Sequence, residues 1–375
     1  MGWKLPRIEG NRADYREDPR WVHPELVNYE NWQGSPRNTD IGAVLTDPDR
    51  PIEERKKARL EFSEGVAAKL KEAESRLPES VRNQGVWKEF RGDAYPDIDP
   101  DDDELSPVHV LVREPRERTG EPLPCVFRIA GGGMMFGDPR EFQPWLLETS
   151  HRQNAVVVSP WFRGSVEGQY PASINDLHAA FRWTVENAEL LNIDPDKIVI
   201  TGASGGGLLV LSLAFRLKRF GYRPRGCVAN EPITEDRMVY PSQKGLTGQW
   251  DGIHMTRGLK QYLTREDYNS PFLGPEALVG RATVEDCIGL CPIFIHTSEH
   301  EPDRDPTLAF MNTLYRAGVY AEVHQWGGTI HGSLYVGDAD QPYKQRYESI
   351  FQGNIADCLK YDLRRDWYWD EKNLR

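Results

Sequence analysis

Short apolar runs alternate with longer amphipathic segments along the second half of the chain. The strand-like runs are rich in β-branched residues and lie at 155–159, 197–201, 226–230, 292–297 and 319–326. Helical patterns fall between or after them, at 176–187, directly behind residue 204, at 307–317 and at 341–361. Because strands and helices alternate in this way, the sequence predicts an α/β fold with a mostly parallel central sheet and helices on both faces.

The sheet is expected to begin earlier, with three further strands at 86–91, 108–112 and 124–130. Gly120 is followed by Glu and Pro between the last two of these strands, which predicts a hairpin turn. The aspartates at 97–104 lack the glycine and glutamate positions of a calcium loop, so they predict an exposed acidic loop.

Two regions outside this pattern are expected to form a cap over the core. Residues 1–50 carry many large apolar side chains without a period, and 52–77 predict a charged surface helix with a sparse apolar stripe. Residues 232–268 are polar and interrupt the alternation as an insertion. The expected division is an N-terminal cap segment, a first core part, a cap insertion and a second core part, at 1–85, 86–231, 232–270 and 271–375.

Charge and composition narrow the classes of partner. The net charge of −12 and the lack of a basic stripe argue against a nucleic-acid partner. No apolar stretch approaches the roughly 20 residues of a membrane span, and the first residues show no secretion signal, so we expect a cytoplasmic protein without a membrane partner. The five cysteines are scattered without a zinc spacing, which predicts buried free thiols and no metal site.

One turn between a predicted strand and a predicted helix carries a candidate nucleophile. Residues 202–206 read G-A-S-G-G and place Ser204 between a β-branched run and an apolar helix. A strand, a sharp turn and a buried helix are the context of a nucleophile elbow, and small neighbours let the strand and the helix approach each other. The alternative is a glycine-rich turn without a chemical role.

An activated serine needs a base and a carboxylate that orients the base. His331 follows the last predicted strand and is flanked by glycines, so it is the expected base. The other histidines considered fall inside strands or inside the insertion, and they are His254, His296 and His324. The loop after the 292–297 strand offers several carboxylates among which spacing alone does not choose, namely Glu299, Glu301, Asp303 and Asp305. The surplus carboxylates are expected to serve the start of the following helix.

Three consecutive glycines, 131–133, directly follow the 124–130 strand. Glycines leave backbone N–H groups uncovered, so this loop predicts donors to a developing oxyanion, together with the N–H of Gly205. A phosphate-binding loop is disfavoured because the G-x-G-x-x-G spacing and a P-loop lysine are absent. The alternative is a flexible glycine loop.

Together these segments resemble the hormone-sensitive-lipase family of α/β-hydrolases, the esterases with an H-G-G-G motif. A-G-G-G at 130–133 stands where the family has H-G-G-G, and G-A-S-G-G at 202–206 stands where it has G-D-S-A-G-G. T-S-E-H-E-P-D-R-D at 297–305 corresponds to T-G-E-x-D-P-L-R-D. Q-Y-P-A-S-I-N-D at 169–176 and T-I-H-G at 329–332 complete the resemblance.

The resemblance implies an α/β-hydrolase fold over about residues 86–360, with a cap formed by the two regions described above. It implies a nucleophile at Ser204, a base at His331 and a catalytic acid at Glu301. The implied oxyanion-hole donors are Gly132, Gly133 and Gly205.

Three departures from the family pattern indicate a divergent branch. Ala130 replaces a histidine, Ala203 replaces an aspartate, and Glu301 replaces the catalytic aspartate. The expected function is a carboxylesterase-like serine hydrolase that cleaves small to moderately sized carboxylic esters through an acyl-enzyme on Ser204, without a cofactor. The residues expected to contact the substrate are Met134, Met135, Phe136 and Trp250.

Two alternative functions stay open at this point. The same residues serve hydrolases of lactones, formamides and aryl amides. A ligand-binding receptor is the other alternative, because plant gibberellin receptors resemble this family and have lost the histidine. All three catalytic positions hold competent residues here, which favours an enzyme, and the sequence leaves a homodimer open.

Overall fold

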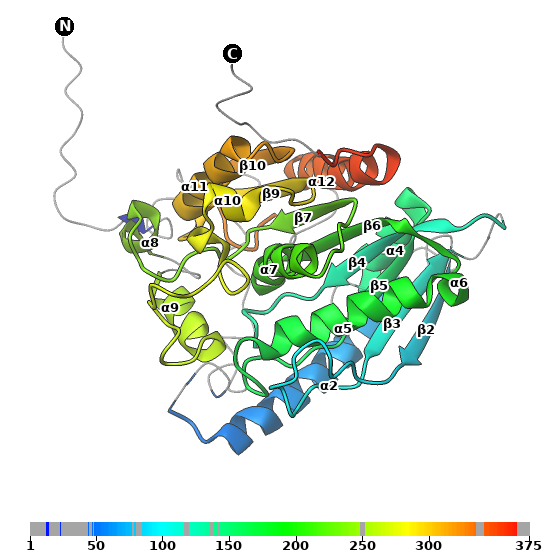
Figure 1. The fold of residues 1–375 in the computed structure, drawn as a ribbon, viewed down its shortest axis with the longest axis horizontal. Helices are drawn as coiled ribbons and strands as arrows, with labels where there is room; N and C mark the ends of the chain where they lie inside the picture. The colour runs from blue at the N-terminus through cyan, green and yellow to red at the C-terminus, as the bar shows by residue number, and fades with distance from the viewer. Residues whose placement is uncertain are drawn as a thin grey trace, which may run out of the picture.

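An eight-stranded sheet with helices on both faces forms the centre of the computed structural model (Figure 1). The structure describes residues 13–14, 23, 44, 47, 49–76, 79, 85–115, 120–135, 138–140, 143–247, 252–334 and 341–365. The strand order is β10-β9-β7-β6-β4-β5-β3-β2. The strands are β2 (Gly85–Arg91), β3 (His109–Pro115), β4 (Leu123–Ile129), β5 (Val156–Pro160), β6 (Ile193–Ala203), β7 (Gly226–Asn230), β9 (Ile293–His300) and β10 (Ala321–Ile330).

Every strand predicted from the apolar runs is present, but the predicted hairpin between 108–112 and 124–130 is wrong. β5 lies between β3 and β4, and β3 pairs antiparallel with β2 and with β5. The other neighbouring strands of the sheet are parallel. Gly120 does turn the chain, with φ 87°. The prediction failed because β4 is buried on both faces and occupies an interior position with a parallel neighbour on each side.

Alternate residues of the central strands point to two separate cores. Val126, Val199 and Val228 pack toward α4 (Gln143–Gln153) and α12 (Pro342–Lys360). Their neighbours Phe127 and Ile200 pack toward α5 (Ala172–Glu186), α7 (Gly205–Arg219) and α11 (Arg304–Arg316). All five cysteines are buried and free, as predicted. This period-two alternation fixes which side of the sheet each helix covers.

The remaining short elements connect these layers. They are α6 (Ala188–Leu191), α8 (Pro241–Gly245), α9 (Gly252–Tyr262), the 3₁₀ turn η4 (Val279–Arg281) and α10 (Val284–Cys287). Among the described residues, no helix combines the length and the apolar composition that crossing a membrane would require.

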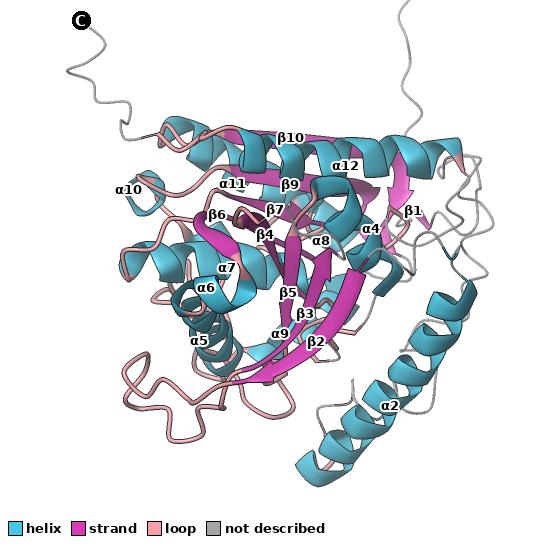
Figure 2. Cartoon of the chain, turned by 90° about the vertical axis from the view of Figure 1, so that its right-hand side faces the viewer, coloured by secondary structure: helices cyan, strands magenta, loops and turns pink. Residues whose placement is uncertain are grey.

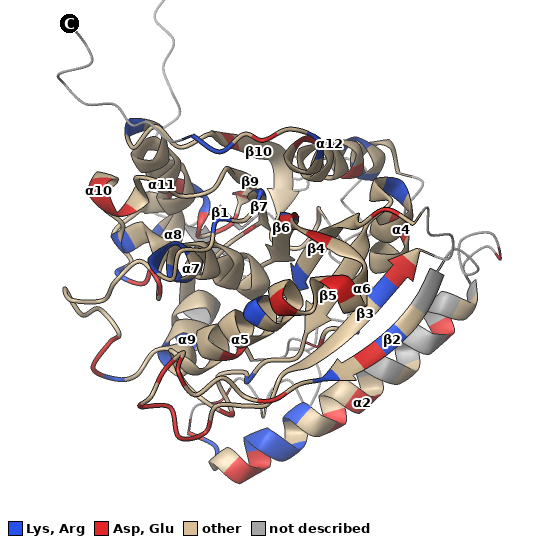
Figure 3. Cartoon of the chain, turned by 45° about the vertical axis from the view of Figure 1, so that its right-hand side comes forward, with Lys and Arg blue, Asp and Glu red and all other residues tan. Residues whose placement is uncertain are grey.

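The charged helix predicted at 52–77 is α2 (Ile52–Arg76), which lies along the outside of the molecule (Figure 2). Charged residues of both signs line its exposed surface (Figure 3). Its inward contacts include Ala58 and two buried arginines, Arg55 and Arg59. Among the described side chains of the helix, these two guanidinium groups add to the apolar contacts of Ala58 and Phe62.

The N-terminal segment contacts the insertion and the end of the sheet. β1 (Ala13–Asp14) pairs in parallel with β8 (Leu246–Thr247), which lies in the insertion. The Arg55 side chain of α2 donates to Gln261 of α9. The N–H of His23 donates to the carbonyl of Gly328 at 2.8 Å. A Cβ at Gly328 would lie 2.8 Å from the His23 nitrogen, so a glycine is needed at this approach.

The acidic segment 97–104 is only partly the exposed loop that we predicted. Arg163 donates to Asp102 at 2.7 and 2.9 Å and to Asp176 at 2.8 Å. The Asp102 side chain is only 13% exposed and that of Asp176 only 3%. Arg163 therefore fastens this loop to α5, and the prediction was wrong for Asp102 because it did not anticipate a distant buried cation.

We expect Arg163→Met to lower the free energy of unfolding by about 3–5 kcal/mol, because it leaves buried carboxylates without their cation. Lys57→Met is the matched control, since its pair with Glu61 is 79% and 51% exposed and an exposed pair contributes below about 1 kcal/mol. Urea denaturation of both variants measures the difference. Equal losses would contradict the importance of the buried pair.

Candidate active site

Ser204 lies at the turn between β6 and α7, with φ 57° and ψ −124°. A residue with a side chain adopts such a positive φ only where the surroundings enforce it, at a cost of about 1–3 kcal/mol. The Ser204 N–H donates to the carbonyl of Asn230 at 2.8 Å, and the N–H of Leu208 donates to the Ser204 carbonyl at 3.1 Å. The backbone thus fixes the serine at the carboxyl end of β6, as the elbow pattern predicts.

Glycines on both sides of Ser204 permit close backbone contacts. A Cβ at Gly202 would lie 2.8 Å from the carbonyl oxygen of Ile129. A Cβ at Gly206 would lie 2.6 Å from the carbonyl oxygen of Ala130. Because real Cβ atoms do not approach backbone oxygens so closely, only glycine lets β4 pack against the start of α7.

A continuous chain of hydrogen bonds joins the three residues predicted as nucleophile, base and acid. The Ser204 Oγ lies 2.9 Å from Nε2 of His331, and Nδ1 of the same ring lies 2.8 Å from Oε2 of Glu301. A proton on Nδ1 leaves Nε2 as an acceptor for the serine hydroxyl. His331 follows β10 and Glu301 follows β9, so parallel strands bring all three residues to one edge of the sheet.

Glu301 is held in a fixed orientation. Its Oε1 accepts hydrogen bonds from the Thr297 hydroxyl and from the Ser298 N–H, the latter at 2.7 Å. The side chain is completely buried, and burial raises the pKa of Glu301 to about 7 although the Thr297 and Ser298 hydrogen bonds and the charge of Arg304 lower it. The hydrogen bonds therefore favour the charged carboxylate against the cost of burying it.

The other carboxylates of this loop contact different groups. Glu299 accepts from the Gly328 N–H at 2.6 Å, and Asp303 accepts from the Thr234 N–H at 2.9 Å. Asp305 lies in the first turn of α11, as expected for a helix-start carboxylate. Asp303 precedes that helix but its side chain makes no capping hydrogen bond. Only Glu301 among the four candidates is hydrogen-bonded to His331 within the described residues.

Two of the remaining candidate histidines have partners away from Ser204. His296 contacts Asn354 and accepts from the Trp326 indole N–H at 3.2 Å, and burial lowers its pKa to about 3. His324 contacts Glu322 in the same strand. Both therefore have the structural positions expected for strand histidines, whereas the side chain of His254 lies outside the described residues.

The glycine loop lies directly against the elbow. Gly132 and Gly133 have φ of 100° and 62°, in the region that favours glycine. A Cβ at Gly205 would lie 2.9 Å from the Gly133 nitrogen and 2.5 Å from the Met134 nitrogen. In the part of the chain that the structure describes, neither Gly132 nor Gly133 donates its N–H to a backbone carbonyl. The N–H of Gly205 opens α7, where intrahelical acceptors are missing.

Residues from other parts of the chain hold the glycine loop in place. Position 130, where the family pattern has a histidine, is an alanine here. The Arg59 guanidinium of α2 donates to the Met135 carbonyl and forms an ion pair with Glu167 at 3.1 Å. The N–H of Ser165 donates to the Met134 carbonyl at 2.9 Å. The arginine of a surface helix is thus part of the support of the glycine loop, which the sequence pattern did not indicate.

The predicted substrate contacts are only partly described. Met134 and Met135 are each 2% exposed. Met134 belongs to the main core, and Met135 packs with Ala58 of α2 and with Val166. Neither side chain offers much surface to a ligand in this conformation. Phe136 and Trp250 lie outside the described residues.

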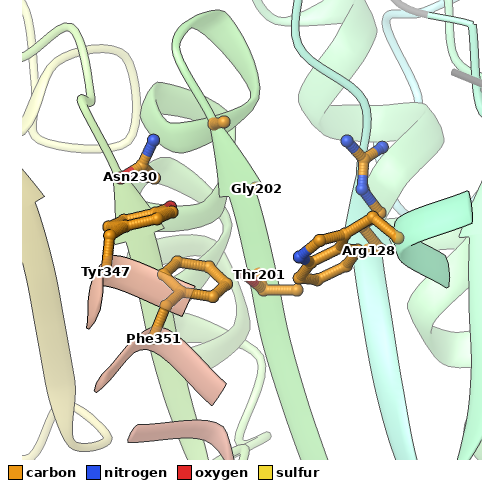
Figure 4. A pocket seen from close by; sticks show the side chains of 8 residues that line it. Arg128, Thr201, Gly202, Asn230, Tyr347 and Phe351 are labelled. Carbon is orange, nitrogen blue, oxygen red and sulfur yellow. The ribbon is translucent and has the colours of Figure 1, made fainter. Parts of the chain in front are cut away.

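A cavity of about 50 Å³ lies behind the elbow on the α12 side of the sheet (Figure 4). It is lined by Arg128, Trp145, Thr201, Gly202, Ala203, Asn230, Tyr347 and Phe351. Neither Ser204 nor His331 is among these residues, so this cavity is distinct from the space in front of the serine hydroxyl.

Sequence reasoning missed one carboxylate of the site, Glu231. One carboxylate oxygen each of Glu231 and Glu301 and one ring nitrogen of His331 lie within 4.8 Å of one another. These are side-chain types that ligate cations, but each is already hydrogen-bonded to protein groups. The position of Glu231 directly after the buried strand predicted at 226–230 could have signalled its place at the sheet edge.

Comparison with known proteins agrees with this geometry. A parallel sheet with a serine elbow at its carboxyl edge defines the α/β-hydrolase class. The family model described as alpha/beta hydrolase fold matches residues 126–335, more than half of the chain. The chain therefore belongs to this family, and the fold class predicted from the sequence is confirmed.

Two curated relatives and one solved structure illustrate what this chain is similar to. Carboxylesterase NlhH of Mycobacterium tuberculosis is 31% identical over 222 residues, which span 56% of this chain and 66% of that protein, just under two thirds of its length. Hormone-sensitive lipase of Ictidomys tridecemlineatus is 27% identical over 127 residues, or 33% of this chain and 17% of that protein. The structure of esterase Est22 superposes with a TM-score of 0.71 at 26% identity, covering 92% of this chain and 98% of its own. The resemblance to the hormone-sensitive-lipase group is confirmed.

The raised pKa of Glu301 predicts a pH-dependent stability. Its folded-state pKa of about 7 exceeds the ordinary value of 4.5, so the folded protein binds more protons than the unfolded chain between these values. Stability is therefore lost as the pH rises through this window, by at most about 3 kcal/mol from this group. Urea denaturation at pH 5 and pH 8 should show wild type losing stability relative to Glu301→Gln. A pH-independent difference would contradict the burial argument.

Proposed function

We propose that the chain is a carboxylic ester hydrolase that acts through an acyl-enzyme on Ser204. The observation that carries this proposal is the hydrogen-bond chain from Ser204 Oγ through His331 to Glu301, at 2.9 and 2.8 Å. These are the distances at which a base can take a hydroxyl proton. The esterase names of NlhH and Est22 support the same reaction class.

In this mechanism His331 Nε2 accepts the Ser204 proton as Oγ attacks the ester carbonyl carbon. Glu301 orients the ring through Nδ1 and stabilises the imidazolium that forms. The N–H groups of Gly132, Gly133 and Gly205 stabilise the oxyanion. His331 then protonates the leaving alcohol. In the second half of the reaction His331 takes a proton from the water that attacks the acyl carbon and returns it to Ser204 Oγ as the carboxylic acid leaves.

We also propose that the N-terminal segment and the insertion form one cap beside the site. The pairing of β1 with β8 and the bond from Arg55 to Gln261 join these two regions. The His23 backbone reaches Gly328, three residues before His331. A cap of this kind favours a small or moderately sized ester, and we expect acetate and butyrate esters to react faster than laurate.

The receptor alternative receives no support from the geometry. A non-catalytic member of the fold does not need a serine, a base and an acid that are hydrogen-bonded to one another. In this chain Ser204, His331 and Glu301 form such a series of hydrogen bonds. The site itself does not distinguish esters from lactones or amides, so the ester class rests on the relatives.

A fluorophosphonate probe should form one adduct, on Ser204. Ser204→Ala should abolish labelling and lower the hydrolysis of p-nitrophenyl esters by about a thousandfold or more. Ser212→Ala is the control, because Ser212 is buried in α7, the helix that follows Ser204, and its hydroxyl donates to the Ala277 carbonyl. Peptide mapping and initial rates measure both effects. An adduct on another serine would overturn the assignment.

The two buried acidic residues of the Glu301 loop should differ in kinetic effect. Glu301→Gln should lower kcat by at least about a hundredfold with little change in KM, because the imidazole loses its orienting carboxylate. Asp303→Asn should cost less than about tenfold in kcat, since Asp303 is bonded to Thr234 and burial holds its pKa well above the usual range. Steady-state kinetics test this ordering, and a reversed ordering would identify Asp303 as the acid.

A further inference from the structure

Glu231 is a second buried carboxylate at the site, and the mechanism above does not use it. It directly follows β7, has no exposed surface and adopts φ 45°. A glutamate in this left-handed conformation costs free energy, so the surrounding contacts must hold it there. Its N–H donates to the His296 carbonyl of β9 at 2.7 Å.

Both carboxylate oxygens of Glu231 accept hydrogen bonds, one from the end of β9 and the other from the loop after β10. The N–H of Gly332, the residue after His331, donates to Oε2 at 2.8 Å. The hydroxyl of Ser298 donates to Oε1, and the N–H of the same serine donates to Glu301. Glu231 therefore bridges the end of β9, beside Glu301, and the loop that carries His331 after β10.

The same stretch of backbone also fixes the nucleophile. The carbonyl of Asn230, the residue before Glu231, accepts the Ser204 N–H at 2.8 Å. The last residue of β7 and the residue that follows it thus hold the elbow on one side and the His331 loop on the other. A displacement of this segment would change the distance between Ser204 and His331.

The charges around Glu231 couple it to the imidazole. His331 lies after β10 and Glu301 lies after β9. The ammonium group of Lys344 on α12 donates to the Leu334 carbonyl at 3.0 Å and interacts electrostatically with Glu231. The pKa of Glu231 is raised to about 7 because burial, with a smaller effect of Glu301 in the same direction, outweighs the lowering by His331 and by the hydrogen bonds from Ser298 and Gly332. Since such coupling is reciprocal, an ionised Glu231 favours the protonated imidazole.

We propose that Glu231 is a positioning residue of this site, which holds the His331 loop through Gly332 and supplies a second carboxylate that stabilises the imidazolium during proton transfer. This inference rests on the proposed ester hydrolysis. A purely structural glutamate would secure the loop without affecting the ionisation of the base.

Glu231→Gln and Glu231→Asp separate positioning from charge. The amide of Glu231→Gln keeps an acceptor but loses the charge. We expect kcat to fall about tenfold, KM to change less than twofold, and the midpoint of the pH profile of kcat/KM to move at least 0.5 units downward. Glu231→Asp keeps the charge but is one methylene too short for Gly332. Its kcat should fall severalfold while its pH midpoint stays at the wild-type value.

The matched control is Glu299→Gln. Glu299 also accepts a backbone N–H from this end of β10, at Gly328, but its side chain is 39% exposed. Its substitution should leave the pH midpoint unchanged. Pre-steady-state and steady-state rates on p-nitrophenyl acetate from pH 5 to 9 provide the measurement for all variants.

Each outcome has a defined meaning. An unmoved pH midpoint in Glu231→Gln would overturn the inference whatever the value of kcat, while leaving the ester-hydrolase proposal intact. If Glu231→Gln does not fold, unchanged kcat in Glu231→Asp would overturn it instead. A wild-type protein that neither hydrolyses esters nor labels at Ser204 would overturn the proposed function itself.

Discussion

The close approach of two backbone segments at Ser204 is the constraint on which the site depends. Ser204 has a positive φ at the point where the backbone after β4 approaches the start of α7. The two segments are so close there that only glycine fits on either side of the serine. The glycine loop after β4 is drawn against Gly205 by the same packing. Backbone sterics therefore set the positions of Ser204 and of the glycine loop, and the Arg59 side chain adds a contact to that loop.

Parallel strand order brings the rest of the chemistry to the same edge. β6, β7, β9 and β10 end beside one another, and their next residues carry the serine, Glu231, the acid and the base. This arrangement buries two carboxyl groups within 4.8 Å of an imidazole. Burial raises both carboxyl pKa values, whereas local hydrogen bonds favour the charged forms of both groups and the imidazole favours that of Glu231.

The sequence revealed local features more readily than distant contacts. The elbow and His331 could be predicted because turn residues and strand ends are local signals. Glu301 was singled out only by resemblance, since four carboxylates shared one loop. The hairpin failed because strand adjacency is decided by the whole sheet. Arg59 and Glu231 contact residues that are far away in the sequence. The local pattern of apolar and polar residues carries no information about such contacts.

Detection of the acyl-enzyme tests the central claim most directly. The protein would be mixed with p-nitrophenyl acetate, quenched in acid within the first turnover, digested and mapped by mass spectrometry, with Glu301→Gln measured alongside. The account predicts an acetyl group on Ser204 that accumulates in wild type or in the variant. Release of p-nitrophenolate by wild type with no acetyl group on Ser204 in either protein, or with the acetyl group on another residue, would contradict it.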